Sequence, residues 1–156
     1  MPTIMVQMAH HDWTLQALHL ACAMSRNYKA DVTLVRMLPV QHIGWLGTDY
    51  AHTPPTPEEY RHLQQYQATA HDYGVELSVI PMQYISLKEA LVDAANELDA
   101  MAVFATLPRS GVSYWRKFQS WDMQRHLAAH HRMLYTLEQP STNVERVPSI
   151  AIPAHK

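Results

Sequence analysis

The stretch AMAVFATLPRSGVSYWRKFQSWDMQRHL, residues 100–127, decides how the rest of the sequence is interpreted. It begins with a short apolar run, Met101 to Ala105, that stands between an acidic helical segment and Pro108. Such a run is typical of a strand buried on both faces of a parallel sheet. Ligands of open α/β sheets bind just beyond the carboxyl ends of these strands. We therefore expect any ligand site after Ala105, in a segment that is basic and aromatic instead of glycine-rich.

Strand-like and helix-like segments alternate along the whole chain. Capping boxes at Thr56 and Ser86 mark the starts of two helices, Asp12 can cap an earlier one, and Gly74 can end the second. We expect strands at 3–8, 32–38, 75–80, 101–105 and 133–137, and helices at 14–28, 57–73, 87–98 and 120–130. This alternation predicts an α/β fold with a single open five-stranded parallel sheet and helices on both faces, a Rossmann-like arrangement.

Length and composition limit the class of protein. With 156 residues, 47% of them apolar, the chain is long enough for one domain spanning 1–156. The region 40–57 has no periodicity and is expected to be a long loop, and 140–156 a polar tail with a small apolar patch at 149–152. The formal net charge of -2 argues against a nucleic-acid partner held by overall charge.

Cysteine content and hydropathy bear on the compartment. Cys22 is the single cysteine, which excludes an internal disulfide and any CxxC motif. No apolar stretch approaches the roughly 18 residues of a membrane span, and no basic segment precedes the first strand. We expect a protein of the reducing cytoplasm with no membrane partner.

Basic and aromatic residues gather in the segment 109–132. Five basic residues stand against one acid there, a local balance of +4. These side chains could hold a small anion, or they could form a solvated face. The aromatic residues among them could stack a ring, or pack under a loop or in a subunit contact. The aromatic residues are Tyr114, Trp115, Phe118 and Trp121.

Metal binding and hydrolysis find little support in the sequence. Eleven histidines are present, but His10 and His11 come with no complete ligand set, and His126 and His130 have no acid between them as in HExxH. Serines of the basic segment have no arranged base and acid beside them. We expect no metal and favour a role that is not enzymatic.

Two segments resemble the universal stress proteins. The run IMVQMAHHDWTLQALHLA at 4–21 is similar to that family's first strand and its Ser/Thr-x-x-Ala-Leu helix, and ADVTLVRMLPV at 30–40 to its second strand. The resemblance continues through 58–80 and 87–106, so it covers nearly the whole chain. It implies the universal stress protein fold and a stress-response role.

The same resemblance implies a changed nucleotide site. Family members that bind ATP carry an Asp after the first strand and Gly-x2-Gly-x9-Gly-[Ser/Thr] after the fourth. Here the Asp position is Ala9, the first two glycines fall on Ala105 and Pro108, and the third falls near Gln119. Proline has no N–H for a phosphate, and the other side chains block close approach of the backbone. We expect ATP, and any other cofactor, to bind weakly or not at all.

Two function hypotheses follow, and they share one candidate cleft. The first is a stress-response domain that acts through protein contacts or an unidentified small ligand. The second is a small-molecule or phosphate-binding protein, or an enzyme, with a rebuilt basic cleft. The candidate cleft residues are Ala9, His10, Met37, Thr106, Arg109, Ser110, Gly111, Arg116, Lys117 and Ser120.

The last expected strand is a candidate dimer contact. It should lie at a sheet edge, where unpaired backbone groups invite another strand, and it carries no Lys or Pro to discourage pairing. Universal stress proteins commonly dimerise through this strand. We expect a homodimer through Met133, Leu134, Tyr135, Thr136 and Leu137.

Overall fold

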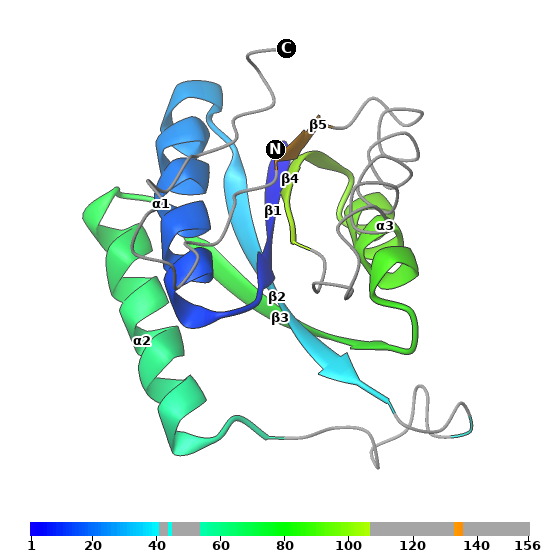
Figure 1. Ribbon diagram of the computed structural model, residues 1–156. Helices are drawn as coiled ribbons and strands as arrows, with labels where there is room; N and C mark the ends of the chain where they lie inside the picture. Colours follow the sequence, from blue (N-terminus) through cyan, green and yellow to red (C-terminus); the bar gives the residue numbers. More distant parts are fainter. Residues whose placement is uncertain (41–43, 45–53, 107–132, 136–156) are drawn as a thin grey trace, which may run out of the picture.

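A computed structural model describes residues 1–40, 44, 54–106 and 133–135 of the chain. Its five strands form a single parallel sheet in the order β3-β2-β1-β4-β5. The fold is therefore the open five-stranded α/β arrangement that the sequence predicts (Figure 1). The elements in chain order are β1 (Thr3–Met8), α1 (His11–Tyr28), β2 (Asp31–Pro39), α2 (Pro57–Asp72), β3 (Leu77–Tyr84), α3 (Leu87–Glu97), β4 (Ala100–Phe104) and β5 (Met133–Tyr135).

Helices cover both faces of the sheet, as expected. In Figure 1, α1 and α2 lie on one side and α3 on the other. The α1/α2 side buries a core around Trp13 and Leu18, together with Ile4 and Val6 of β1. The α3 side buries a smaller core around Leu91 and other residues of α3, β1, β2, β4 and β5. Alternate residues of β1 thus enter opposite cores, as a strand buried on both faces requires.

Strand β3 is longer than the sequence suggests. The sequence predicts an end at Ile80, before Pro81, but the strand continues to Tyr84. Among the described strands β3 pairs with β2 alone, and Arg36 of β2 is opposite Pro81. An edge strand tolerates proline because its missing N–H is not needed for a second ladder. The predicted strand end is therefore wrong for a reason set by sheet position.

Helix ends agree with the capping predictions in three cases and differ in one. The hydroxyls of Thr56 and Ser86 accept hydrogen bonds from the N–H groups three residues on, at 3.1 and 3.5 Å. Gly74 follows α2 with a φ of 71°, a left-handed conformation that glycine adopts without strain. Asp12, however, does not cap α1: the helix begins at His11, and Asp12 lies in its first turn. There its carboxylate faces the positive end of the helix dipole.

Some predicted features lie outside the described residues. These are the expected helix at 120–130, positions 136 and 137 of the last strand, most of the 40–57 loop and the tail at 140–156. The loop is predicted to extend to residue 57, one residue too far, because Pro57 is the first residue of α2. Among the described residues no helix combines the length and the apolar character that crossing a bilayer requires.

Candidate functional site

The carboxyl ends of β1 and β4 form the switch point of the sheet. From β1 the chain builds β2 and β3 on one side, and then crosses to β4 and β5 on the other. Ligands of open α/β sheets bind at such a point. Ala9 follows β1, and Thr106 follows β4 by two residues, so both predicted cleft residues lie at this edge.

The two strand ends are joined by a hydrogen bond. The backbone N–H of Thr106 donates to Oε1 of Gln7 over 2.8 Å. Gln7 is buried, with 4% of its surface exposed. A buried side-chain amide needs such a partner, because an unpaired one would be costly. The backbone N–H of Thr106 at the switch point is therefore already bonded within the chain.

The turn from β1 into α1 is closed by Thr14. Its Oγ1 accepts a hydrogen bond from the N–H of Ala9 at 2.8 Å and donates one to the carbonyl of His10 at 2.9 Å. Thr14 is completely buried, whereas the side chain of His10 is exposed. The turn therefore satisfies its own polar groups, and the Ala9 N–H is already bonded.

Met37 lies away from Ala9. Its side chain packs with the core on the α3 side of the sheet, while Ala9 packs with the core on the α1/α2 side. The structure thus brings Ala9, His10 and Thr106 to one edge but places the Met37 side chain on the opposite face from Ala9. The remaining predicted cleft residues, Arg109, Ser110, Gly111, Arg116, Lys117 and Ser120, lie outside the described residues.

A polar cluster between α1, α2 and β2 was missed by sequence reasoning. Nε of Arg36 lies 3.1 Å from Oε2 of Glu59, and Arg36 is 9% exposed. The rings of His11 and His62 stack with centroids 3.8 Å apart, and Nδ1 of His11 is 2.9 Å from the Tyr66 hydroxyl. One available signal was Arg36, a charged residue between the apolar residues Val35 and Met37 of β2. We call these five residues the α1–α2 cluster.

Tyr66 connects the α1–α2 cluster to the β1–α1 turn. Burial raises the pKa of its hydroxyl, a hydrogen bond with Thr14 lowers that pKa, and the Asp12 carboxylate raises it. Thr14 therefore forms hydrogen bonds both in the β1–α1 turn and with the α1–α2 cluster. The tyrosine is 1% exposed, so its hydroxyl stays protonated and can donate or accept within the cluster.

Thiol and metal chemistry receive no support from the described residues. Burial raises the pKa of the Cys22 thiol to about 11, so the reactive thiolate is scarce at neutral pH. Within residues 1–40, 54–106 and 133–135 no three His, Cys, Asp or Glu side chains come together as a metal site would need.

Several solved universal stress proteins have a similar fold. One, in complex with cAMP, superposes with a TM-score of 0.63 at 14% identity, over 89% of this chain and 98% of that one. The protein from Archaeoglobus fulgidus gives 0.61 at 16% identity, over 88% and 94%. A universal stress protein from Archaeoglobus fulgidus in complex with dAMP gives 0.51 at 16% identity, over 88% and 98%. The fold is thus that of universal stress proteins.

Comparison of the amino-acid sequence of this chain with protein families and curated proteins gives no match. The likeness to universal stress proteins therefore rests on the fold and on the segments quoted above.

Proposed function

We propose that this chain is a universal-stress-protein-like stress-response domain of the cytoplasm that does not bind ATP. In this proposal it acts as a homodimer, through protein contacts or an unidentified small ligand. The observation that carries the proposal is the switch point: the N–H groups of Ala9 and Thr106 are both bonded to buried side chains of the same chain. The fold shared with universal stress proteins supports the stress-response part of the proposal.

The missing carboxylate and the occupied donors weigh against ATP together. Ala9 offers no side-chain oxygen, and its N–H is held by Thr14. A hydrogen bond to a charged group is worth about 1.5 to 3 kcal/mol. Losing two would lower affinity by roughly two to four orders of magnitude. A site with a dissociation constant near 1 μM would then have one of about 0.1 to 10 mM.

Isothermal titration of the intact protein with Mg-ATP tests this proposal directly. We expect no measurable heat of binding at ligand concentrations that saturate a micromolar site. Native mass spectrometry of freshly purified protein is the companion measurement, and should show a dimer without a bound nucleotide. A micromolar dissociation constant, or a retained nucleotide, would refute the proposal.

The second candidate function is binding of a small anionic ligand in a rebuilt cleft. It is favoured by the +4 balance of residues 109–132, directly after the strand that lies at the switch point. The neighbours in complex with cAMP and dAMP have the same fold. In this alternative Arg109, Arg116 and Lys117 would replace the glycine loop as phosphate ligands. A retained anion in the native mass spectrum, lost in Arg116→Ala, would favour it.

The homodimer proposal rests on the position of β5. This strand pairs with β4 alone among the described strands, and 45% of the Met133 surface is exposed. An open edge of this kind can accept a strand from a second copy. Met133→Lys places a charge at that edge and should shift the protein toward monomer in light scattering, while Met1→Lys, at a side chain 87% exposed, should not. A wild-type monomer at micromolar concentration would refute the dimer.

A further inference from the structure

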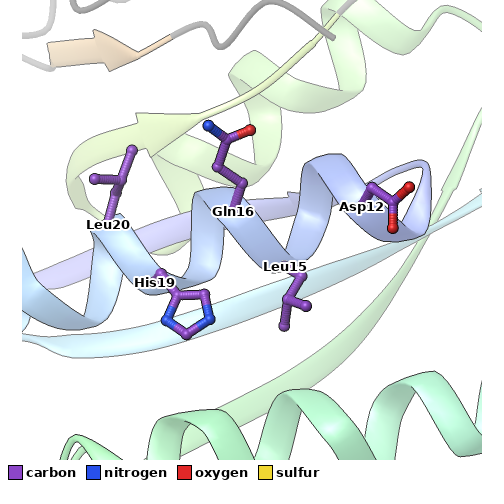
Figure 2. A pocket seen from close by; sticks show the side chains of 5 residues that line it. All are labelled: Asp12, Leu15, Gln16, His19 and Leu20. Carbon is purple, nitrogen blue, oxygen red and sulfur yellow. The ribbon is translucent and has the colours of Figure 1, made fainter. Parts of the chain in front are cut away.

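The outward side of α1 carries a shallow hollow that the switch point does not use. Its volume is about 330 Å³, and the described residues that line it are Asp12, Leu15, Gln16, His19 and Leu20. Figure 2 shows Gln16 and Leu20 on one side of the helix and Leu15 and His19 on the other. The two leucines give it apolar walls. One wall is held in place, because Nδ1 of His19 lies 3.0 Å from the Tyr73 hydroxyl of the α2 end.

These residues form a second helical stripe on α1. They follow one another at the i, i+3, i+4, i+7 and i+8 positions, the spacing of one face of a helix. The first stripe, which includes Trp13, Ala17, Leu18 and Ala21, already faces the sheet and is buried. Leu15 and Leu20 are only partly buried. Because α1 has apolar residues on its outward side in addition to those that face the sheet, we expect another segment to cover the outward side.

We propose that the hollow on α1 is covered by residues 147–153 of the same chain, VPSIAIP. This segment supplies Val147, Ile150 and Ile152 as apolar side chains. Prolines near both of its ends, Pro148 and Pro153, disfavour a helix and favour an extended course. An extended apolar segment of this length suits a shallow groove along a helix.

The length of chain after β5 permits this contact. β5 ends at the carboxyl edge of the sheet, and α1 begins at that same edge. β5 is two strands from β1, which is about 10 Å, and the helix layer is about 10 Å further out. Residues 136–146 number eleven (146 minus 135) and can span up to roughly 36 to 40 Å. The span of residues 136–146 therefore exceeds the distance from β5 to α1.

Disulfide trapping in the full-length chain tests the proposal. The test variant combines Gln16→Cys, in the hollow, with Ala151→Cys, in the proposed segment. The matched control variant combines Asp93→Cys, on the exposed side of α3 across the sheet, with the same Ala151→Cys change. The native Cys22 does not interfere, because it is fully buried. Mild oxidation is followed by non-reducing electrophoresis and peptide mapping.

We expect the test variant to form an intramolecular disulfide at a rate at least roughly tenfold above that of the control variant, since a segment without preference would meet both positions at similar effective concentration. Adding Ile150→Asp and Ile152→Asp to the test variant should lower its rate to that of the control. Equal rates in the two variants, no disulfide in either, or a disulfide between two chains would each overturn the proposal. The last result would assign the hollow to a second copy.

Discussion

The switch point and the α1–α2 cluster are two polar regions on the carboxyl side of the same sheet, and they differ in chemistry. At the switch point, neutral groups satisfy one another: the N–H groups of Ala9 and Thr106 bond to buried Thr14 and Gln7. The α1–α2 cluster holds the ion pair Arg36 and Glu59 and titratable rings. The two described backbone donors at the switch point are thus already bonded within the chain, whereas the described ion pair joins α2 to β2.

The largest effect should come from Thr14, which both regions share. Thr14→Val keeps the shape but removes the acceptor of the Ala9 N–H and the donor to the His10 carbonyl. The His10 carbonyl keeps its bond from the backbone N–H of residue 14, but the Ala9 N–H loses its acceptor and Tyr66 loses its bond to Thr14. A buried group left unsatisfied costs about 1 to 3 kcal/mol. We expect the free energy of unfolding, measured with urea, to fall by about 2 to 3 kcal/mol.

Thr14→Ser is the matched control because it keeps the hydroxyl and loses a methyl group. It should lose only about 1 kcal/mol. If the valine variant were no less stable than the serine variant, the turn would not depend on this hydroxyl, and the contrast between the two regions would lose its basis.

Tyr66 should show the next largest effect, and a dependence on pH. Tyr66→Phe removes the hydroxyl that meets Nδ1 of His11, which should cost about 1 to 2 kcal/mol at neutral pH. Burial, the main cause, raises the pKa of Tyr66 above its ordinary value of 10.0. A raised pKa means that the folded state holds the proton more tightly than the unfolded chain. The stability from the neutral hydroxyl is therefore complete below pH 10 and is lost as pH rises through the folded pKa.

Urea unfolding between pH 8 and pH 11 checks this sign, because Tyr66→Phe should lose less stability over that range than the parent protein. Cys22 has a raised pKa as well, of about 11, so both proteins should carry Cys22→Ala to isolate the tyrosine. Parallel curves for the two proteins would contradict the prediction.

Much of the fold could be predicted, because the strands are short apolar runs and Thr56, Ser86 and Gly74 mark helix ends by local chemistry. The errors have tertiary causes. Pro81 is tolerated because β3 is an edge strand, and an edge is a property of the whole sheet. The cap of α1 was misplaced because Thr14, inside the helix, closes the turn in place of Asp12.

The candidate site was predicted only in part. Sequence order placed Ala9 and Thr106 after strands, and the parallel sheet brings those strand ends to one edge. The α1–α2 cluster joins residues far apart in the chain, His11 and Tyr66 being 55 positions apart. No local pattern pairs them, and only the packing of α1 on α2 reveals the contact.

Glu59 should have a smaller effect than Tyr66. Glu59→Gln removes one charge of an ion pair in which the arginine side chain is 10% exposed and the glutamate side chain 35%. Solvent around the partly exposed carboxylate screens the pair, so we expect a loss of about 1 kcal/mol. Glu58→Gln is the matched control, since it removes a neighbouring first-turn acid with the same helix-dipole contribution. Equal losses in thermal or urea unfolding would assign the effect to the dipole and not to Arg36.

The smallest effect should follow from restoring the carboxylate at the switch point. Ala9→Asp supplies the side chain that ATP-binding universal stress proteins carry after the first strand, at a position that is half-buried and beside exposed His10. The N–H of residue 9 remains bonded to Thr14, and the N–H of Thr106 to Gln7, so neither of these two donors is released for a phosphate. We expect stability within about 0.5 kcal/mol of the parent protein and no ATP binding by isothermal titration. Adding Ala105→Gly, Pro108→Gly and Gln119→Gly extends the test to the sequence that follows β4. If Ala9→Asp alone produced micromolar affinity, the closed turn would not be the barrier, and a single missing oxygen would explain the difference from the ATP-binding proteins.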